Sequence, residues 1–237
     1  MGWSDPGPSP RDARQVSTEL HTLLAKAGIA GPYVLVGHSA GGSYVRMYTA
    51  QYPDEVVGMV LVDPGHPDMS SRIPELQAQN ANDRQLVGTM QMLSYLGIPR
   101  LMGIGKANAQ GLPPEQAAEV NAFVSTPQHW ATILALIDAT PATNDEVRTT
   151  GTLGNRPLVV ISADTAWLSR GAPADDARHR LNELHAELAK LSTNSSHRII
   201  EGTTHGSLVH NRDHAQATVA AVEAVLTAIQ TGQPLTP

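Results

Sequence analysis

The sequence predicts an α/β protein built on a doubly wound parallel sheet, and three observations carry this prediction. Short apolar runs typical of strands occur at about 33–37, 56–63, 157–162 and 197–201. Segments with apolar residues at helical spacing alternate with these runs, and such alternation favours parallel strands. The run at 56–63 is apolar at consecutive positions, as expected of a central strand with both faces buried.

The first predicted helix begins in the segment Ser9-Pro10-Arg11-Asp12. Ser9 is expected to cap this helix, Pro10 suits the first helical position, and Asp12 stands where a capping-box acid belongs. Gly28 supplies a C-terminal stop, and the first strand follows at about 33–37.

The next predicted helix runs from Ser43 to about Gln51 and ends before Pro53, which would interrupt it. After the strand at 56–63, residues 66–152 contain no run typical of a strand. We expect helices there through the eighties and nineties, at 114–124 and at 127–139. This insert is expected to cover the carboxyl ends of the strands.

Beyond the insert, a strand is expected at 157–162, a helix at 175–191 and a last strand at 197–201. Asp213 is expected to cap the final helix. The predicted apolar face of that helix consists of Val219, Val222, Val225, Leu226 and Ile229.

Composition limits the classes of function. The chain has 237 residues, is 41% hydrophobic and carries a net charge of −6, which suits a domain with a substantial core and a small-molecule substrate. Basic residues are scattered, so neither a nucleic-acid nor a membrane partner is expected. Without cysteine there is no disulfide or thiolate metal site, and His210 and His214 are too few for a metal centre. We expect no cofactor and, with no signal peptide visible, a cytoplasmic location.

The most informative segment is Gly37-His38-Ser39-Ala40-Gly41-Gly42, which follows the first strand and precedes a helix. A sharp strand-to-helix turn of this composition presents a serine hydroxyl at the edge of the sheet. Side chains at Gly37 and Gly41 are expected to clash in such a turn. Ser39 is therefore the predicted nucleophile, and the backbone N–H of Ala40 is the predicted oxyanion donor.

These features together resemble the α/β-hydrolase family. The segment around Ser39 resembles its nucleophile elbow, Trp3-Ser4-Asp5-Pro6 resembles its G-x-S-D-x-P segment, and Gly202-Thr203-Thr204-His205 resembles its late histidine loop. The resemblance extends from Gly2 to about residue 230. It implies a hydrolase core at 1–65 and 153–237 with a helical cap at 66–152.

The resemblance also implies four strands before the one at 33–37, and the chain contains none of them. The sheet is therefore expected to be truncated at its N-terminal side, with an exposed apolar edge strand. A second copy of the chain at that edge, and so a homo-oligomer, is a further expectation.

A serine nucleophile needs a base, and His205 in the loop after the last strand is the predicted one. Two aspartates are candidates for the acid that would orient His205, because Asp63 and Asp164 each follow a strand on the correct side. The family more often uses the later position, but Asp164 comes two residues early for its usual spacing. Asp63 is preferred, with Asp164 as the alternative.

Serine at the elbow implies acyl transfer through an acyl-enzyme, most simply on a small hydrophobic carboxylic ester. His38 beside the nucleophile and the apolar residues Met90, Leu93 and Leu96 of the insert are predicted to contact the substrate. The alternative is an inactive or weakly active remnant that serves as a binding or interaction module, because the second oxyanion donor would lie among the absent strands.

Overall fold

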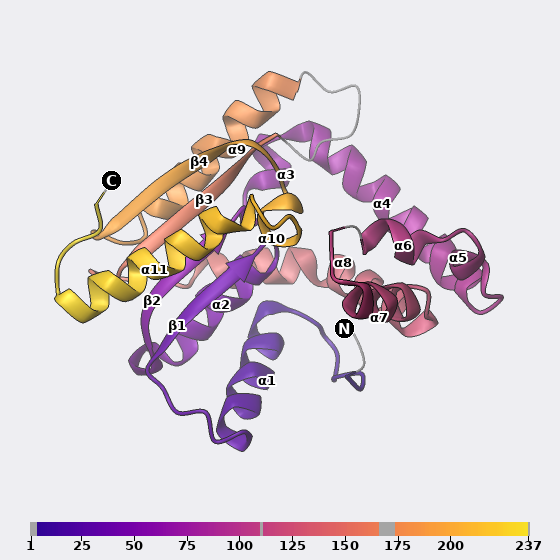
Figure 1. Cartoon of the computed structure of the whole chain (residues 1–237), viewed down its shortest axis with the longest axis horizontal. Helices are drawn as coiled ribbons and strands as arrows, with labels where there is room; N and C mark the ends of the chain where they lie inside the picture. The colour runs from indigo at the N-terminus through magenta and orange to yellow at the C-terminus, as the bar shows by residue number, and fades with distance from the viewer. Residues whose placement is uncertain (1–3, 110, 166–173, 237) are drawn as a thin grey trace.

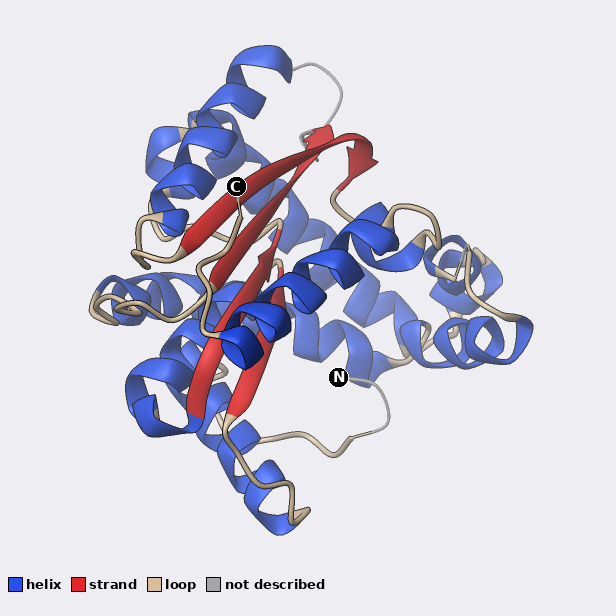
Figure 2. Cartoon of the chain, turned by 60° about the vertical axis from the view of Figure 1, so that its left-hand side comes forward, coloured by secondary structure: helices blue, strands red, loops and turns tan. Residues whose placement is uncertain are grey.

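The computed structural model describes residues 4–109, 111–165 and 174–236. Its sheet has four parallel strands in the order β1-β2-β3-β4. Their bounds are Tyr33–His38, Val56–Val62, Leu158–Thr165 and Ser195–Thr204. This architecture, with helices on both faces (Figures 1 and 2), confirms the predicted α/β class.

The two central strands are apolar on both faces because each face packs against helices. Met59 and Leu61 of β2 contribute to a core shared with α2 (Gly41–Gln51) and α9 (Ala174–Ala189). Val60 and Val62 contribute to a second core under α11 (Ala215–Thr231), on the other face. Burying each such side chain is worth roughly 1.5–3 kcal/mol. The consecutive apolar residues of the sequence therefore divide between two layers.

The described segment between β2 and β3 forms its regular structure from helices, most of which lie to the right of the sheet in Figure 1. Its two long helices, α4 and α8, pack against each other. Within the described residues, no helix combines the length and the hydropathy needed to cross a membrane. The elements are α3 (Met69–Arg72), α4 (Pro74–Ser94), α5 (Ile98–Leu101), α6 (Ile104–Asn108), α7 (Pro114–Val124) and α8 (Pro127–Arg148).

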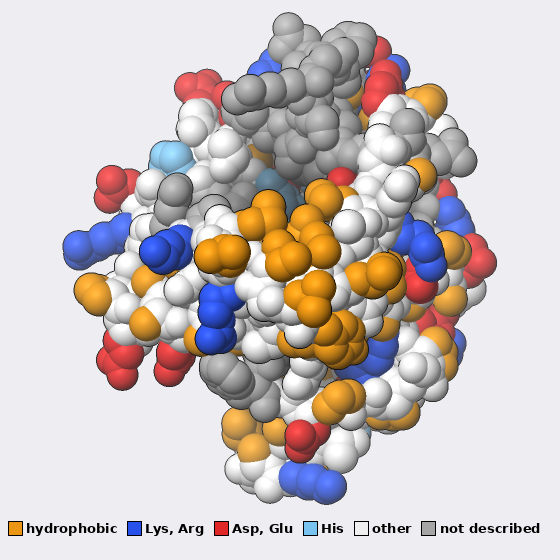
Figure 3. Space-filling model, turned by 90° about the vertical axis from the view of Figure 1, so that its right-hand side faces the viewer, with side chains coloured by type: hydrophobic (Ala, Val, Ile, Leu, Met, Phe, Trp, Pro, Cys, Tyr) orange, Lys and Arg blue, Asp and Glu red, His pale blue; other side chains and the backbone are white. Residues whose placement is uncertain are grey.

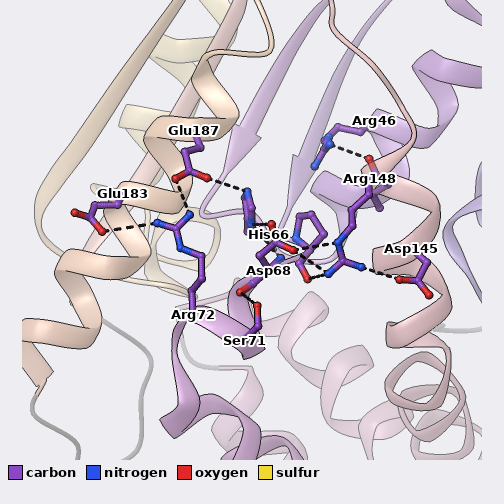
Figure 4. A network of polar contacts seen from close by, with 11 residues as sticks. Arg46, His66, Asp68, Ser71, Arg72, Asp145, Arg148, Glu183 and Glu187 are labelled. Carbon is purple, nitrogen blue, oxygen red and sulfur yellow. Dashed lines mark hydrogen bonds and ion pairs between the residues drawn. The ribbon is translucent and has the colours of Figure 1, made fainter.

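Arginine side chains connect these helices to the loop after β2 and to α9 (Figure 4). Arg148 at the end of α8 pairs with Asp68 at 2.9 Å and with Asp145 at 2.7 Å. Arg72 at the end of α3 pairs with Glu187 of α9 at 2.6 Å. A single exposed ion pair adds little to the free energy of unfolding. The main effect of this set is therefore to fix the relative positions of the segments that it connects.

The predicted helix ends require three corrections. Asp12, not Ser9, is the N-cap of α1 (Ala13–Lys26), and its side chain accepts a hydrogen bond from the Gln15 N–H at 2.9 Å. Asp213 does not cap α11, whose N-cap is His214 without a side-chain hydrogen bond. Helix α8 continues to Arg148 through Pro141, nine residues beyond its predicted end at 139.

The predicted apolar face of α11 is confirmed in part. Val225 is buried, and Val222 and Ile229 pack against the same core. Val219 is 47% and Leu226 is 41% exposed, whereas Ala221 and Ala228 are buried. Small residues allow this helix to approach the sheet closely. The predicted face included only large apolar side chains and therefore left out the buried alanines.

Candidate active site

The turn between β1 and α2 holds Ser39 in a left-handed conformation with φ 56°. A Cβ on Gly37 would lie 2.6 Å from the Gly41 carbonyl oxygen, and one on Gly42 would lie 2.8 Å from the Pro64 Cβ. A Cβ on Gly41 would meet nothing within 4 Å, so the predicted clash there is wrong. A non-glycine residue in this region costs about 1–3 kcal/mol, and such strain concentrates at functional sites.

Hydrogen bonds, two between backbone groups and one from a side chain, tie three loops together at the carboxyl ends of the strands. The Ser39 N–H donates to the Val62 carbonyl at 3.1 Å, and the Gly65 N–H donates to the Ser39 carbonyl at 3.0 Å. His38 donates through Nε2 to the His205 carbonyl at 3.0 Å. The turns after β1, β2 and β4 therefore meet at one corner of the sheet.

Within this corner, Asp63 and His205 form a short hydrogen bond. Asp63 Oδ2 lies 2.6 Å from His205 Nδ1, and the Ala163 N–H donates to Asp63 Oδ1 at 2.9 Å. Asp63 is only 3% exposed and has φ 42°. Because a carboxylate accepts, Nδ1 of His205 carries the proton, and Nε2 of the neutral ring is the acceptor. That is the tautomer a general base needs.

The surroundings lower the pKa of Asp63 and that of His38, which favours a charged Asp63 and a neutral His38. Burial favours a higher pKa for Asp63, but the hydrogen bonds from His205 and from the Ala163 N–H leave that pKa below its ordinary value. Burial, together with the nearby His205, lowers the pKa of His38. His38 packs against His205 with 4.5 Å between ring centroids, beside the predicted nucleophile.

Asp164, the alternative acid, has other partners. Its carboxylate accepts from the Gly202 N–H at 3.2 Å and from Arg178 at 3.4 Å. It therefore supports the last residues of β4. Of the two candidate aspartates, the one in contact with His205 Nδ1 is Asp63.

The remaining residues singled out in the sequence have varied surroundings. Met90 and Leu93 of α4 are half-buried, whereas Leu96 is 76% exposed. Trp3 lies outside the described residues. His214 contacts the Ser207 hydroxyl at 2.9 Å. Over the described ranges, no three His, Cys, Asp or Glu side chains are grouped so that they could hold a metal ion.

Exposed apolar side chains gather on α4 and α5. Figure 3 shows the hydrophobic surface on the side of the molecule that these helices occupy. Its exposed large members include Leu86, Met92, Tyr95, Leu96, Leu101 and Met102.

Sequence reasoning missed a group of polar side chains behind Asp63, namely Ser162, His185 and His197. One signal was available in the sequence. His185 stands within the apolar face of α9, among Leu181, Leu184 and Leu188, where a polar residue needs a buried partner.

Comparison with known proteins places the chain in a family. A model described as "Alpha/beta hydrolase family" matches residues 1–222. An uncharacterized protein of Schizosaccharomyces pombe is 38% identical over 103 residues, which is 44% of this chain and 18% of that protein. The chain spans less than a fifth of the length of the first curated relatives that it matches.

Solved structures extend the similarity to the whole described fold. A thermophilic esterase from Thermogutta terrifontis aligns with a TM-score of 0.59 at 19% identity, over 95% of this chain and 77% of that one. MGS-M2, an alpha/beta hydrolase enzyme from a deep-sea metagenome library, aligns with a TM-score of 0.61 at 17% identity, over 100% and 78%. Likeness at this identity concerns the fold alone. Since the family match covers most of the chain, this protein belongs to the alpha/beta hydrolase family.

Proposed function

We propose that this protein is a serine hydrolase that cleaves carboxylic esters through an acyl-enzyme. The observation that carries the proposal is the 2.6 Å hydrogen bond between buried Asp63 and His205, at the corner where the Ser39 turn is also anchored. A buried carboxylate that fixes a histidine tautomer beside a strained serine is the arrangement that activates a hydroxyl nucleophile.

In the first half-reaction, His205 Nε2 takes the proton of the Ser39 hydroxyl while Oγ attacks the ester carbonyl carbon. Asp63 stabilises the imidazolium that forms, because its carboxylate already accepts the Nδ1 proton. The Ala40 N–H, at the start of α2, would stabilise the oxyanion. His205 then gives its proton to the departing alcohol oxygen, which leaves an acyl ester on Ser39.

In the second half-reaction, a water molecule gives a proton to His205 and attacks the acyl carbon. Collapse of the second tetrahedral intermediate breaks the bond to Ser39 Oγ, which recovers the proton from His205. The carboxylic acid is released. Each group thus returns to its starting protonation state.

A hydrophobic acyl or alcohol group is the proposed substrate feature. The support is the half-buried position of Met90 and Leu93 on α4 and the apolar surface that continues onto α5. Methionine adapts to varied apolar shapes. The name of the Thermogutta neighbour as an esterase agrees with this choice of bond.

Labelling by a fluorophosphonate probe tests the proposal directly, with hydrolysis of p-nitrophenyl esters of increasing chain length measured in parallel. We expect covalent label on the peptide that contains Ser39, and its loss in Ser39→Ala and His205→Ala. His179→Ala removes a histidine whose side chain is 74% exposed and serves as the control. A folded protein that binds an ester analogue but takes up no label would instead support the binding-module alternative.

A further inference from the structure

A polar chain of three buried or half-buried side chains lies behind Asp63. We propose that His185 is a positioning residue, which holds the Asp63-Pro64 turn so that the Asp63 carboxylate stays aligned with His205. Ser162 and His197 would fix the orientation and tautomer of His185. The inference rests on the proposed function, because alignment of Asp63 matters for catalysis only if His205 acts as a base.

The contacts form an unbroken line from β4 to the turn after β2. His197 Nε2 lies 2.7 Å from Ser162 Oγ, and Ser162 Oγ lies 2.7 Å from His185 Nδ1. His185 Nε2 lies 2.8 Å from the Pro64 carbonyl oxygen. Ser162 is fully buried and His185 is 1% exposed, so neither group has a solvent alternative for its hydrogen bonds.

The chemistry of the partners assigns every proton in this line. The Pro64 carbonyl can only accept, so His185 Nε2 carries a proton and Nδ1 of the neutral ring is an acceptor. The Ser162 hydroxyl therefore donates its single proton to His185. Its oxygen then accepts from His197, which must carry a proton on Nε2. One arrangement satisfies all three side chains.

The Asp63-Pro64 turn needs such support. Asp63 has φ 42°, a conformation that persists in a non-glycine residue only where the surroundings over-determine it. On its upstream side, the Asp63 N–H donates to the Ile161 carbonyl at 2.7 Å. On its downstream side, Pro64 is buried and its carbonyl is held by His185. The downstream side of the turn is thus restrained by His185 together with the Gly65 N–H, which donates to the Ser39 carbonyl.

The neutrality of His185 matters as well as its position. Its Nδ1 lies 3.9 Å from Asp63 Oδ1, and in the assigned tautomer that atom carries no proton. A cation there would compete with His205 for the same carboxylate. Burial lowers the pKa of His185 to about 4. The nearby His197 and His66 also lower this pKa, whereas Asp63 raises it. The ring therefore stays neutral at neutral pH.

Two substitutions of His185 separate the effect of its hydrogen bonds from the effect of its side-chain volume. His185→Gln keeps one acceptor and one donor, whereas His185→Leu keeps only volume. We expect His185→Leu to lower kcat for ester hydrolysis by about 100-fold with KM changed by less than about three-fold, because misplacement of a catalytic group by about 1 Å has that effect. His185→Gln is expected to recover most of kcat.

The matched control is Leu184→Val, which perturbs a fully buried neighbour on the same helix that is not part of the polar line. We expect it to lower the midpoint of urea unfolding while leaving kcat unchanged. Should His185→Leu fail to fold, Ser162→Ala removes the hydroxyl that orients His185 and is expected to lower kcat about 10-fold, on the same misplacement argument.

A second readout is independent of turnover. The His205 Nδ1 proton shared with Asp63 is expected to give a strongly downfield proton resonance, which persists in His185→Gln and is lost or shifted in His185→Leu. Wild-type kcat together with an unchanged resonance in folded His185→Leu would overturn the inference, as would an equal loss of kcat in Leu184→Val. Absence of esterase activity in the wild-type chain would refute the proposed function, and the resonance would still decide whether His185 positions Asp63.

Discussion

Ser39 and Asp63 are non-glycine residues with positive φ, and they occupy equivalent places at the ends of adjacent strands. His38 of β1 is paired with Val62 of β2, so each strained residue directly follows that pair. Strain at both positions turns the chain sharply at the carboxyl edge and presents a hydroxyl and a carboxylate at the same corner. The fold thus concentrates local strain where the proposed chemistry occurs.

Asp63→Asn tests the acid, and Asp164→Asn is its matched control. The amide cannot fix the base tautomer of His205, so Asp63→Asn is expected to lower kcat by about 10⁴-fold, the effect of this change in Ser-His-Asp hydrolases. Asp164 bonds to Gly202 and Arg178, and its substitution is expected to change kcat only slightly. Ester hydrolysis measured at neutral pH decides between them, and the reverse order of effects would assign the acid to Asp164.

Substitutions of Gly37 and Gly41 by alanine form a second matched pair, which tests the effect of the turn's packing on the free energy of unfolding. A methyl group at Gly37 would overlap the Gly41 carbonyl, whose oxygen lies 2.6 Å from the place that the added carbon would take, whereas nothing lies within 4 Å of one at Gly41. Gly37→Ala is expected to lower the free energy of unfolding by about 1–3 kcal/mol. Gly41→Ala is expected to raise it by up to about 1 kcal/mol, because the unfolded chain loses freedom. Urea unfolding measures both, and similar losses would contradict the packing argument.

At the scale of elements, β1 is an edge strand of the sheet. Among the described residues it pairs only with β2, and Val36 is 46% exposed. An apolar edge strand is a template for pairing with another chain. We therefore expect the protein to self-associate at high concentration, and Val36→Lys to shift it toward the monomer.

Sedimentation velocity over a range of concentrations measures this shift. Leu23→Lys is the control, because Leu23 is 63% exposed but lies on α1 instead of the sheet edge. Equal dissociation by both substitutions would indicate general surface hydrophobicity, and a monomeric wild-type chain would contradict the expectation.

The strands were predicted within a few residues because buried parallel strands are continuous apolar runs. Helix limits were less predictable, because they depend on contacts beyond the helix itself. Asp12 and Ser9 are both plausible caps by residue type, and only the backbone geometry selects Asp12. A helix was predicted to end at 139, whereas α8 continues through Pro141 to Arg148 while packed against α4.

At the scale of the whole molecule, the candidate site depends on contacts between distant segments. Ser39 could be found from its local motif, because the turn and its small residues are adjacent in sequence. Sequence reasoning preferred Asp63 but kept Asp164 as the alternative, because both follow neighbouring strands of the sheet, β2 and β3. The contact of Asp63 with His205, 142 positions away, depends on how the strand ends are staggered in space.

Histidines buried in neutral form make the stability of the whole molecule depend on pH. Burial lowers the pKa of His185 and of His66 to about 4 each, against about 6.5 in an unfolded chain. His66 is also influenced by Asp68, Arg46, Glu187 and Arg72 around it (Figure 4). Between these values the unfolded chain binds protons that the folded chain does not.

The free energy of unfolding should therefore fall as the pH is lowered from about 6.5 toward 4, by about 1.4 kcal/mol per pH unit for each of the two residues. Stability from Asp63, whose folded pKa is lowered, is lost only at still lower pH, as the carboxylate is protonated. Urea unfolding at a series of pH values measures the slope. His185→Gln and His66→Gln should each reduce it, whereas His179→Gln, at a side chain 74% exposed, should not. A slope that none of these substitutions alters would mean that other groups, such as the partly buried His38, His129 and His197, control acid stability.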